Sequence, residues 1–180
     1  DLLEMYSCFP SAVQIYAREL GIDLRRQLTV TGGMTFGGGP LNNFVLQSTC
    51  RMAELLREKP GCKGLVTSVS GMLTKQGFGV WSTTPNPAGF GYADVTEEAR
   101  VAAPPIELVP AEAGEGAVAG CTVLYHGDNP LRAVAVVTLD NGKRTVAYSD
   151  DAEVMTGMMS SEYCGRRVTI SDGRFSVLQA

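Results

Sequence analysis

The chain has 180 residues, of which 44% are hydrophobic and 19% are charged, and its formal net charge is −4 at pH 7. This composition is typical of a globular protein and excludes a disordered or fibrous chain. No run approaches the roughly 20 consecutive apolar residues that a membrane-spanning helix needs, so we expect a cytoplasmic protein without a membrane span.

The first part of the chain, residues 1–85, alternates helices and strands. A helix is expected over Pro10–Leu20, because Pro10 suits a first turn and Gly21 a stop. Residues 28–30 are expected to be a strand, and Leu41–Lys59 a helix with Asn42 or Asn43 as its N-cap. Short strands are expected at 64–68 and 77–83. This alternation indicates an α/β layer in which helices cover a sheet.

The Gly-rich stretch between Thr29 and Asn43 leads from the expected strand into the second expected helix. Such a turn is a place where backbone meets ligand. A phosphate-binding loop of the Walker type needs Lys-Ser or Lys-Thr after its last glycine, whereas Gly38 and Gly39 follow Gly37 here. A dinucleotide fingerprint needs a third glycine where Asn42 stands. Nucleotide binding is therefore not favoured.

Residues 86–103 have the Pro, Gly and charge density of a linker, and residues 104–180 have the period of strands. Strands are expected at 117–125, 132–139, 144–148, 166–170 and 174–178, with hairpin turns at Asn141-Gly142 and Asp172-Gly173. A short helix with an Asp cap is expected at 150–159. Five strands with one helix between the third and fourth predict a small all-β barrel of the OB type.

The charge of this second part argues against the nucleic-acid binding that an OB barrel often performs. Residues 104–180 contain ten acidic and six basic residues, whereas a groove that follows phosphates needs the reverse. We therefore interpret this domain as a structural or interaction module.

Residue types that carry chemistry are sparse. The five cysteines form no Cys-x-x-Cys pair, which predicts reduced thiols. The single histidine, His126, cannot supply a zinc ligand set, so no metal is expected, and its His-Gly-Asp-Asn-Pro context predicts a solvated turn.

Three segments of residues 1–85 resemble the thiolase superfamily. Glu4-Met-Tyr-Ser-Cys-Phe-Pro10 resembles the Asn-Glu-Ala-Phe motif, and more closely its His-Asp-Cys-Phe variant in sterol-carrier-protein-2 type thiolases. Thr31-Gly-Gly-Met-Thr-Phe-Gly-Gly-Gly-Pro40 resembles the stretch that runs into the Gly-His-Pro motif, and Gly64-Leu-Val-Thr-Ser-Val-Ser-Gly71 resembles the strand with the Cys-x-Gly motif. The trailing domain is similar to the additional C-terminal domain of bacterial thiolase-like proteins of type 1, in the acetyl-CoA acetyltransferase family.

The resemblance implies a fold of two similar halves that hold a coenzyme A thioester between them. It identifies residues 1–85 as the C-terminal half of a thiolase core without its first strand and helix, and the start at Asp1 fits a fragment or cleaved product. The implied partners are the N-terminal half of the same core, which would cover an apolar patch on the helices, and acyl-CoA. A homodimer through the core and a role in lipid metabolism are also implied.

The resemblance also implies a chemistry, from which this chain departs. In thiolases, side chains of the three motifs polarise the thioester oxygen and move protons. Here Tyr6, Gly39 and Val69 occupy those positions, with Ser70 next to the last. Glycine and valine have no side-chain proton to transfer, so thiolase-type acid/base catalysis cannot run through them. The nucleophilic cysteine would lie in the N-terminal half, and the fragment alone is expected to be inactive.

The residues expected to contact coenzyme A or acyl-CoA come from the same three motifs: Tyr6, Phe9, Gly38, Gly39, Pro40, Ser70 and Gly71. Tyr6 would donate to the thioester oxygen or simply pack, and Cys8 would be a nucleophile or a buried thiol. Lys75 would meet the phosphates of coenzyme A or stay solvated.

Two hypotheses remain at the level of the sequence. In the first, the chain is part of a protein that binds acyl-CoA and has lost the usual acid/base residues. In the second, the full-length protein is an active acetyl-CoA acetyltransferase or an acyl-CoA-cleaving enzyme, which uses Tyr6 or a backbone oxyanion site at Gly38 and Gly39.

Overall fold

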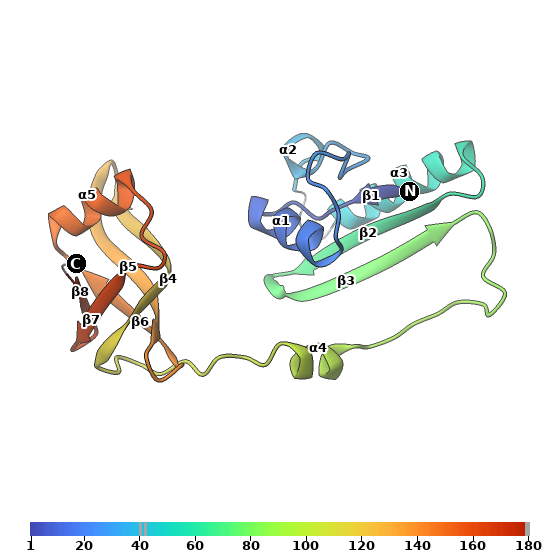
Figure 1. The fold of residues 1–180 in the computed structure, drawn as a ribbon. Coiled ribbons are helices and arrows are strands. Elements are labelled where there is room, and N and C mark those ends of the chain that lie inside the picture. Colours follow the sequence, from blue (N-terminus) through green and yellow to red (C-terminus); the bar gives the residue numbers. More distant parts are fainter. Residues whose placement is uncertain (40, 42, 179–180) are drawn as a thin grey trace. The chain divides into compact units, whose positions relative to one another are not determined.

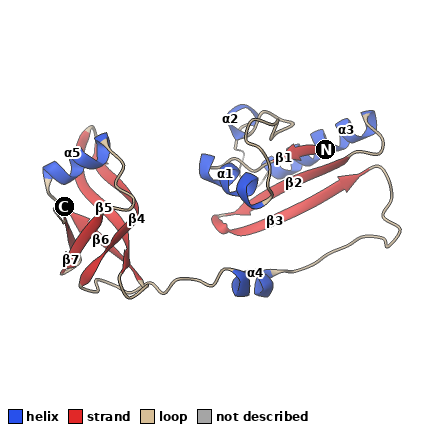
Figure 2. Ribbon diagram, in the orientation of Figure 1, coloured by secondary structure: helices blue, strands red, loops and turns tan. Residues whose placement is uncertain are grey.

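The computed structural model describes residues 1–39, 41 and 43–178, and the chain divides into two compact units, Asp1–Tyr92 and Ala93–Ala180 (Figure 1). The first unit is α/β and the second contains a barrel of strands (Figure 2). Together they give a mixed α/β protein with a three-stranded and a five-stranded sheet.

The sheet of the first unit has the order β1-β2-β3. Strand β1 (Leu2–Glu4) runs parallel to β2 (Lys63–Ser70), and β2 forms an antiparallel hairpin with β3 (Met72–Ser82). The turn of this hairpin passes through Gly71, whose φ of 71° favours glycine.

Helices cover both faces of this sheet, because successive strand residues point to opposite faces. Helix α1 (Pro10–Glu19) packs Ala12 and Tyr16 against Leu3 and Met5. Helix α3 (Phe44–Glu58) packs Met52 and Leu56 against Val66, which shares the opposite face with Leu2. In the sequence, the one-turn helix α2 (Met34–Gly37) lies between α1 and α3.

The prediction of a strand at residues 28–30 is wrong, and β1 was not predicted. The segment makes one ladder-like bond, from the Met5 N–H to the Leu28 carbonyl (3.0 Å). The N–H groups of Val30 and Thr31 donate instead to the carboxylate of Glu4, at 2.8 and 2.9 Å. A side chain therefore takes the donors that a neighbouring strand would have used.

The predicted helices of the first unit are confirmed with shifted ends. Helix α3 begins at Phe44 rather than at Leu41, and Asn43 occupies the N-cap position without a side-chain hydrogen bond. Asn42, the other candidate cap, lies outside the described residues. The two predicted short strands extend to 8 and 11 residues in β2 and β3.

The second unit contains a closed barrel with the strand order β4-β5-β6-β8-β7. Its strands are β4 (Gly114–His126), β5 (Asn129–Leu139), β6 (Arg144–Ser149), β7 (Arg167–Ser171) and β8 (Arg174–Val177). The barrel closes because β4 pairs with β7 as well as with β5. Helix α5 (Ala152–Ser160) lies between β6 and β7, and α4 (Thr96–Ala102) precedes the barrel. The side chain of Asp151 accepts from the Glu153 N–H, so the predicted Asp cap is confirmed.

The barrel core is formed by inward-pointing residues of alternate strand positions. Val137 and Val168 are fully buried, and Phe175 is 2% exposed. Val154 and Met155 of α5 pack against the same cluster and cover one end of the barrel. Within the described ranges, no helix is both long enough and apolar enough to cross a membrane.

Candidate functional site

The three motif segments meet at the carboxyl ends of the parallel strands β1 and β2. The Tyr6 N–H, two residues after β1, donates to Thr67 Oγ1 of β2 at 2.8 Å. The Ser7 Oγ accepts from the Met34 N–H of the glycine turn at 2.9 Å. The carboxyl end of parallel strands is where open α/β sheets bind ligands. Segments distant in the sequence are thus hydrogen-bonded into one site.

The Gly-rich stretch that follows Thr29, called the glycine turn here, is anchored by the buried carboxylate of Glu4, a residue that is 1% exposed. Its two oxygens accept from the hydroxyls of Thr29 and Thr31, at 2.9 to 3.0 Å, and from the Val30 and Thr31 N–H groups. A buried carboxylate is costly unless donors surround it, and here they do. The hydroxyls in turn accept from the N–H groups of Gly32 (3.0 Å) and Gly33 (3.2 Å). The anchor therefore fixes the backbone of the turn.

Gly33 is required where the turn touches the first motif. Its φ is 78°, and an added Cβ would lie 2.9 Å from the Ser7 Oγ. A side chain here would force the Ser7 hydroxyl, which accepts from the Met34 N–H, to shift. The close approach of the two motifs depends on this glycine.

Tyr6 is held next to the glycine turn by an aromatic contact. Its ring meets the ring of Phe44 edge to face, with the centroids 5.8 Å apart. Phe44 is 3% exposed, and a Cβ on Gly37 would approach its ring to 3.1 Å. Tyr6, Phe44 and Gly37 thus form one continuous wall, in which Tyr6 itself is half-buried.

A second tyrosine lies beneath the first motif. Tyr16 of α1 is 2% exposed, and its hydroxyl donates to the Ser68 carbonyl at 3.4 Å. Burial raises the pKa of Tyr16, a hydrogen bond with Thr67 opposes this, and neighbouring Cys8 and Tyr6 add to the rise. The phenol therefore stays protonated at neutral pH. Cys8 is half-buried and packs on the same cluster, as a structural thiol would.

The other predicted site residues divide by exposure. Val69 packs on the cluster around α1, so its side chain serves the core. Exposed positions are Phe9, which is the N-cap of α1, Gly38, Gly39, Ser70, Gly71 and Lys75. Lys75 lies in β3 rather than in a loop. Pro40 lies outside the described residues.

The arrangement offers surfaces for binding and few groups for proton transfer. The Gly38 N–H donates to the Met34 carbonyl at 3.0 Å, so it is engaged within α2 and does not point freely at a ligand. Within the described part of the chain, no group of three or more His, Cys, Asp or Glu side chains could hold a metal ion.

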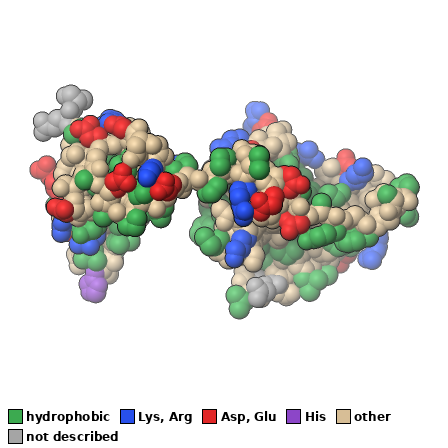
Figure 3. All heavy atoms as spheres, turned by 90° about the horizontal axis from the view of Figure 1, so that it is seen from below, with side chains coloured by type: hydrophobic (Ala, Val, Ile, Leu, Met, Phe, Trp, Pro, Cys, Tyr) green, Lys and Arg blue, Asp and Glu red, His purple; other side chains and the backbone are tan. Residues whose placement is uncertain are grey.

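Two other features belong to the second unit. A hollow of about 460 Å³ is lined by residues of α5, β8 and their neighbours, among them Asp151, Tyr163 and Phe175, and none of the predicted site residues lines it. His126 is exposed at the tip of the β4–β5 hairpin, where it is the purple side chain of Figure 3. The predicted solvated turn is therefore confirmed.

Sequence reasoning missed four residues that build the site: Glu4, Ser7, Thr67 and Phe44. Glu4 and Ser7 lie inside the first motif, and an acidic residue at the end of an apolar run was the available signal. Thr67 and Phe44 act through contacts across the fold, which local pattern does not carry.

Comparisons with known proteins agree with this geometry. Residues 96–174 match the family model of the thiolase-like protein type 1 additional C-terminal domain. The chain is similar to a crystal structure of a monomeric SCP2-thiolase like protein type 1 from Mycobacterium smegmatis, with a TM-score of 0.84 and 26% sequence identity. The similarity covers 98% of this chain and 41% of that one, so this chain spans less than half the length of its relative. No curated protein sequence matches. Residues 96–174 thus match the additional C-terminal domain of thiolase-like protein type 1, and the fold of the chain is similar to part of a protein of that type.

Proposed function

We propose that the chain contributes one wall of a coenzyme A or acyl-CoA site in a thiolase-like protein whose usual acid/base residues are replaced. The observation that carries the proposal is the convergence of the three motif segments, joined by the Tyr6–Thr67 and Ser7–Met34 hydrogen bonds. This chain alone is not expected to be catalytic.

The glycine turn has the properties that a thioester-binding wall needs. Its base is fixed by Glu4, while Gly38 and Gly39 at its far end are exposed and carry no side chain. A pantetheine arm and a thioester are slender groups that require close backbone approach. A rigid turn without side chains supplies this approach at little entropic cost.

The same residues argue for altered chemistry. Gly39 has no side chain and Val69 packs in the core, so neither can transfer a proton.

A second candidate is an active acyl-CoA C-acyltransferase or acyl-CoA-cleaving enzyme in full-length form. The half-buried phenol of Tyr6, at the first motif position, favours it. The engaged N–H of Gly38 argues against a two-amide oxyanion site at Gly38 and Gly39.

We infer that the barrel is of the OB type. Its order 1-2-3-5-4, the parallel contact of β6 with β8 and the helix between the third and fourth strands support this inference. Because acidic residues outnumber basic ones in residues 104–180, we assign it a structural or interaction role rather than nucleic-acid binding.

We further infer that the N-terminal half of a thiolase core covers the apolar surface of the first unit. The exposed apolar residues of β3 are Met72, Phe78, Val80 and Trp81, and Leu46 of α3 is also exposed. Figure 3 shows hydrophobic side chains on the surface of the right-hand unit. The M. smegmatis relative is described as monomeric, and a homodimer through the core remains a prediction for this protein.

The test is calorimetric titration of coenzyme A and acetyl-CoA into the full-length protein, with an assay of acetoacetyl-CoA thiolysis on the same preparation. We expect binding without turnover. Gly39→Leu should weaken binding at least tenfold, because its Cβ meets only the flexible end of Met34 at 3.1 Å and the rest of the side chain fills the turn. Gly91→Leu is the matched control, since a Cβ there meets nothing within 4 Å.

The outcomes separate the two candidates. If the full-length protein cleaves acetoacetyl-CoA, and Tyr6→Phe abolishes this turnover while ligand binding persists, the acyltransferase candidate is established. Absence of binding by both ligands, or equal binding by Gly39→Leu and the parent, would overturn the coenzyme A proposal.

A further inference from the structure

The linker, residues 86–103, carries large apolar side chains that the sheet and the barrel leave uncovered. Every residue of the linker is exposed, and Phe90 and Tyr92 are 95% and 83% exposed. Among the described residues, each hydrogen bond of the linker joins two of its own residues. A flexible tether is normally rich in Gly, Ser or charged residues. Aromatic side chains in such a segment are typical of a surface that binds a partner.

The first part of the linker has a formed turn, which fixes how Phe90 is presented. The Asn86 side-chain oxygen accepts from the Ala88 N–H at 3.1 Å, and the Asn86 carbonyl accepts from the Gly89 N–H at 2.9 Å. Gly89 has a φ of 78°, which favours glycine, and Phe90 follows it directly. A backbone that is already ordered loses less conformational entropy when its side chains bind.

Helix α4 is the second ordered part of the linker. The Asp94 carboxylate accepts from the N–H and the hydroxyl of Thr96, at 3.0 and 2.6 Å, and Glu97 pairs with Arg100 at 2.9 Å. The seven residues of α4 bury no side chain. Isolated helices shorter than about 12 residues are marginal in water, and one exposed ion pair adds little. A partner that packs on α4 would supply the missing stabilisation.

The linker continues directly from a surface that is already inferred to be covered. Strand β3 ends at Ser82, and its exposed apolar side chains are those that we assign to the contact with the N-terminal half. Phe90 follows only eight residues after Ser82. The apolar surface of β3 and the aromatic residues of the linker are therefore within reach of one partner, because an extended chain spans about 3.3 Å per residue.

The length of the solved relative points to the same partner. Its similarity covers 98% of this chain, so it extends through the linker, but it covers only 41% of the M. smegmatis chain. More than half of that longer chain lies outside the match and is available as a cover. A surface in the same polypeptide meets the linker at an effective concentration that is roughly millimolar, which favours it over a separate protein.

We propose that the linker is a strap, which binds through Phe90, Tyr92 and α4 to the N-terminal half of the thiolase core in the full-length protein. This inference rests on the proposed contact of β3 with that half and extends it. The receiving surface should be apolar, with room for two aromatic rings. The linker contains three acidic residues and one basic residue, so basic side chains are expected at the edge of the receiving surface.

The experiment places the photoreactive residue p-benzoylphenylalanine at position 90 of the full-length protein and identifies the cross-linked peptides by mass spectrometry. We expect cross-links to peptides that lie outside residues 1–180. Position 97 is the matched control in the same linker, because the Glu97 side chain is 73% exposed in its ion pair with Arg100. The same substitution there should give no such cross-link.

The strap is refuted if position 90 gives no cross-link, cross-links only within residues 1–180, or cross-links only between two copies, which a mixture of isotope-labelled and unlabelled protein reveals. Equal cross-linking from positions 90 and 97 would also refute it. The same probe at Val80 reports the contact of β3. Cross-links from Val80 without any from position 90 overturn the strap alone, and failure at both positions overturns both contacts. Neither result depends on binding of coenzyme A.

Proteolysis provides a second measurement on the full-length protein. Chymotrypsin cleaves after aromatic residues that are free, so a bound strap should resist cleavage after Tyr92. Phe90→Ser removes one anchor and should speed this cleavage by about tenfold, whereas Glu97→Gln should leave it unchanged. Cleavage after Tyr92 that is equally fast in the parent and in Phe90→Ser would contradict the proposal.

Discussion

At the scale of single residues, Glu4 has the largest structural effect on the candidate site, although the expected chemistry gives it no role. Glu4 is 1% exposed, and its carboxylate accepts from four donors of residues 29–31, which are the hydroxyls of Thr29 and Thr31 and the N–H groups of Val30 and Thr31. Those residues hold the N–H groups of Gly32 and Gly33 in turn. Glu4 is thus a positioning residue that fixes the backbone of the glycine turn.

Removing this carboxylate should destabilise the first unit. Glu4→Ala leaves the part-buried Val30 N–H without an acceptor, at a cost of about 1–3 kcal/mol, and leaves the Thr31 N–H with only the Thr29 hydroxyl, at 3.1 Å. Glu4→Gln keeps one oxygen for these two donors and should cost less, roughly 1–2 kcal/mol for the lost charge-assisted bonds. Urea unfolding of both variants measures the difference.

Glu54→Gln is the control for this pair of variants. Glu54 is exposed on α3 in an ion pair with Arg51, and such a pair contributes about 0.5 kcal/mol or less. If Glu4→Ala unfolded at the urea concentration of the parent, the anchoring role of Glu4 would be refuted.

At the scale of elements, local signals predicted what local interactions determine. The Asp172-Gly173 turn has φ values of 49° and 71°, as its hairpin signal requires, and the Asp cap of α5 is present. The elements that failed depend on distant partners. Strand β1 has three residues and exists because it pairs with β2, about 60 residues away. The strand expected at 28–30 is replaced by bonds to Glu4.

The candidate site follows the same division. Tyr6, Gly39 and Val69 could be assigned to motif positions from the sequence by the resemblance alone, and that assignment stays a prediction. The contacts of Tyr6 with Phe44 and Thr67 could not, since they join segments separated by 38 and 61 residues. The exposure of Gly38 and the partial burial of Val69 are likewise set by packing rather than by the local sequence.

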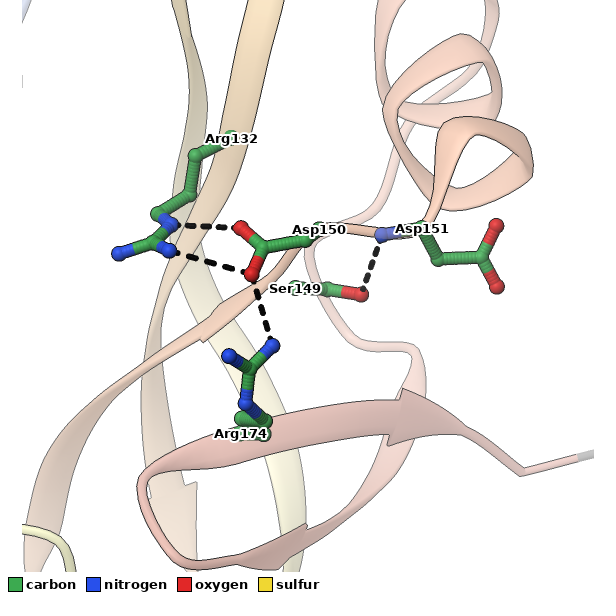
Figure 4. A network of polar contacts seen from close by, with 5 residues as sticks. All are labelled: Arg132, Ser149, Asp150, Asp151 and Arg174. Atoms are coloured by element: carbon green, nitrogen blue, oxygen red, sulfur yellow. Dashed lines mark hydrogen bonds and ion pairs between the residues drawn. The ribbon is translucent and has the colours of Figure 1, made fainter.

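Side chains reinforce the contact between strands β6 and β8, which is called the seam of the barrel below. Strands β6 and β8 share one backbone pairing, Tyr148 with Arg174. Asp150 follows β6 and accepts from Arg132 Nε at 2.6 Å and from Arg174 Nη1 at 2.7 Å (Figure 4). The two guanidiniums also lie 4.2 and 4.9 Å from the centre of the Tyr148 ring. One carboxylate therefore joins β5, β6 and β8.

Acid should open this seam before it unfolds the rest of the barrel. Hydrogen bonds from Arg132 and then Arg174 lower the pKa of Asp150 below its usual value. A group with a lowered folded-state pKa contributes stability above its unfolded pKa of about 3.9, and the contribution is lost as the pH falls through the folded pKa. The difference in unfolding midpoint between the parent and Asp150→Asn should therefore be constant from about pH 6 to 8 and shrink below about pH 4.

Asp128→Asn, in the exposed β4–β5 hairpin tip, is the matched control, and its midpoint should follow the parent at every pH. A pH-independent difference for Asp150→Asn would show that its carboxylate charge does not hold the seam.

At the scale of the whole molecule, the two units differ in how completely they bury their apolar side chains. The barrel surrounds a core on all sides. The first unit covers β1 and β2 with helices but leaves Met72 and Val80 of β3 62% and 72% exposed. Strand β3 is also an edge of its sheet among the described strands, with backbone groups available for pairing. A surface with these two properties is typical of a place where a partner binds.

Without that partner, the chain should associate with itself through β3. Burying one Val or Met side chain contributes about 1.5–3 kcal/mol, so Val80→Lys should weaken self-association by at least about tenfold. Sedimentation velocity over a range of protein concentrations measures this, and binding of a hydrophobic dye should fall in parallel. Val146→Lys, on the outer face of β6 and 47% exposed, is the control and should associate as the parent does. Under the proposed contact between β3 and an N-terminal half, the same Val80→Lys change in the full-length protein should also weaken that contact. A parent chain that stays monomeric at high concentration would show that β3 needs no cover, and the inferred contact with an N-terminal half would then lose its physical basis.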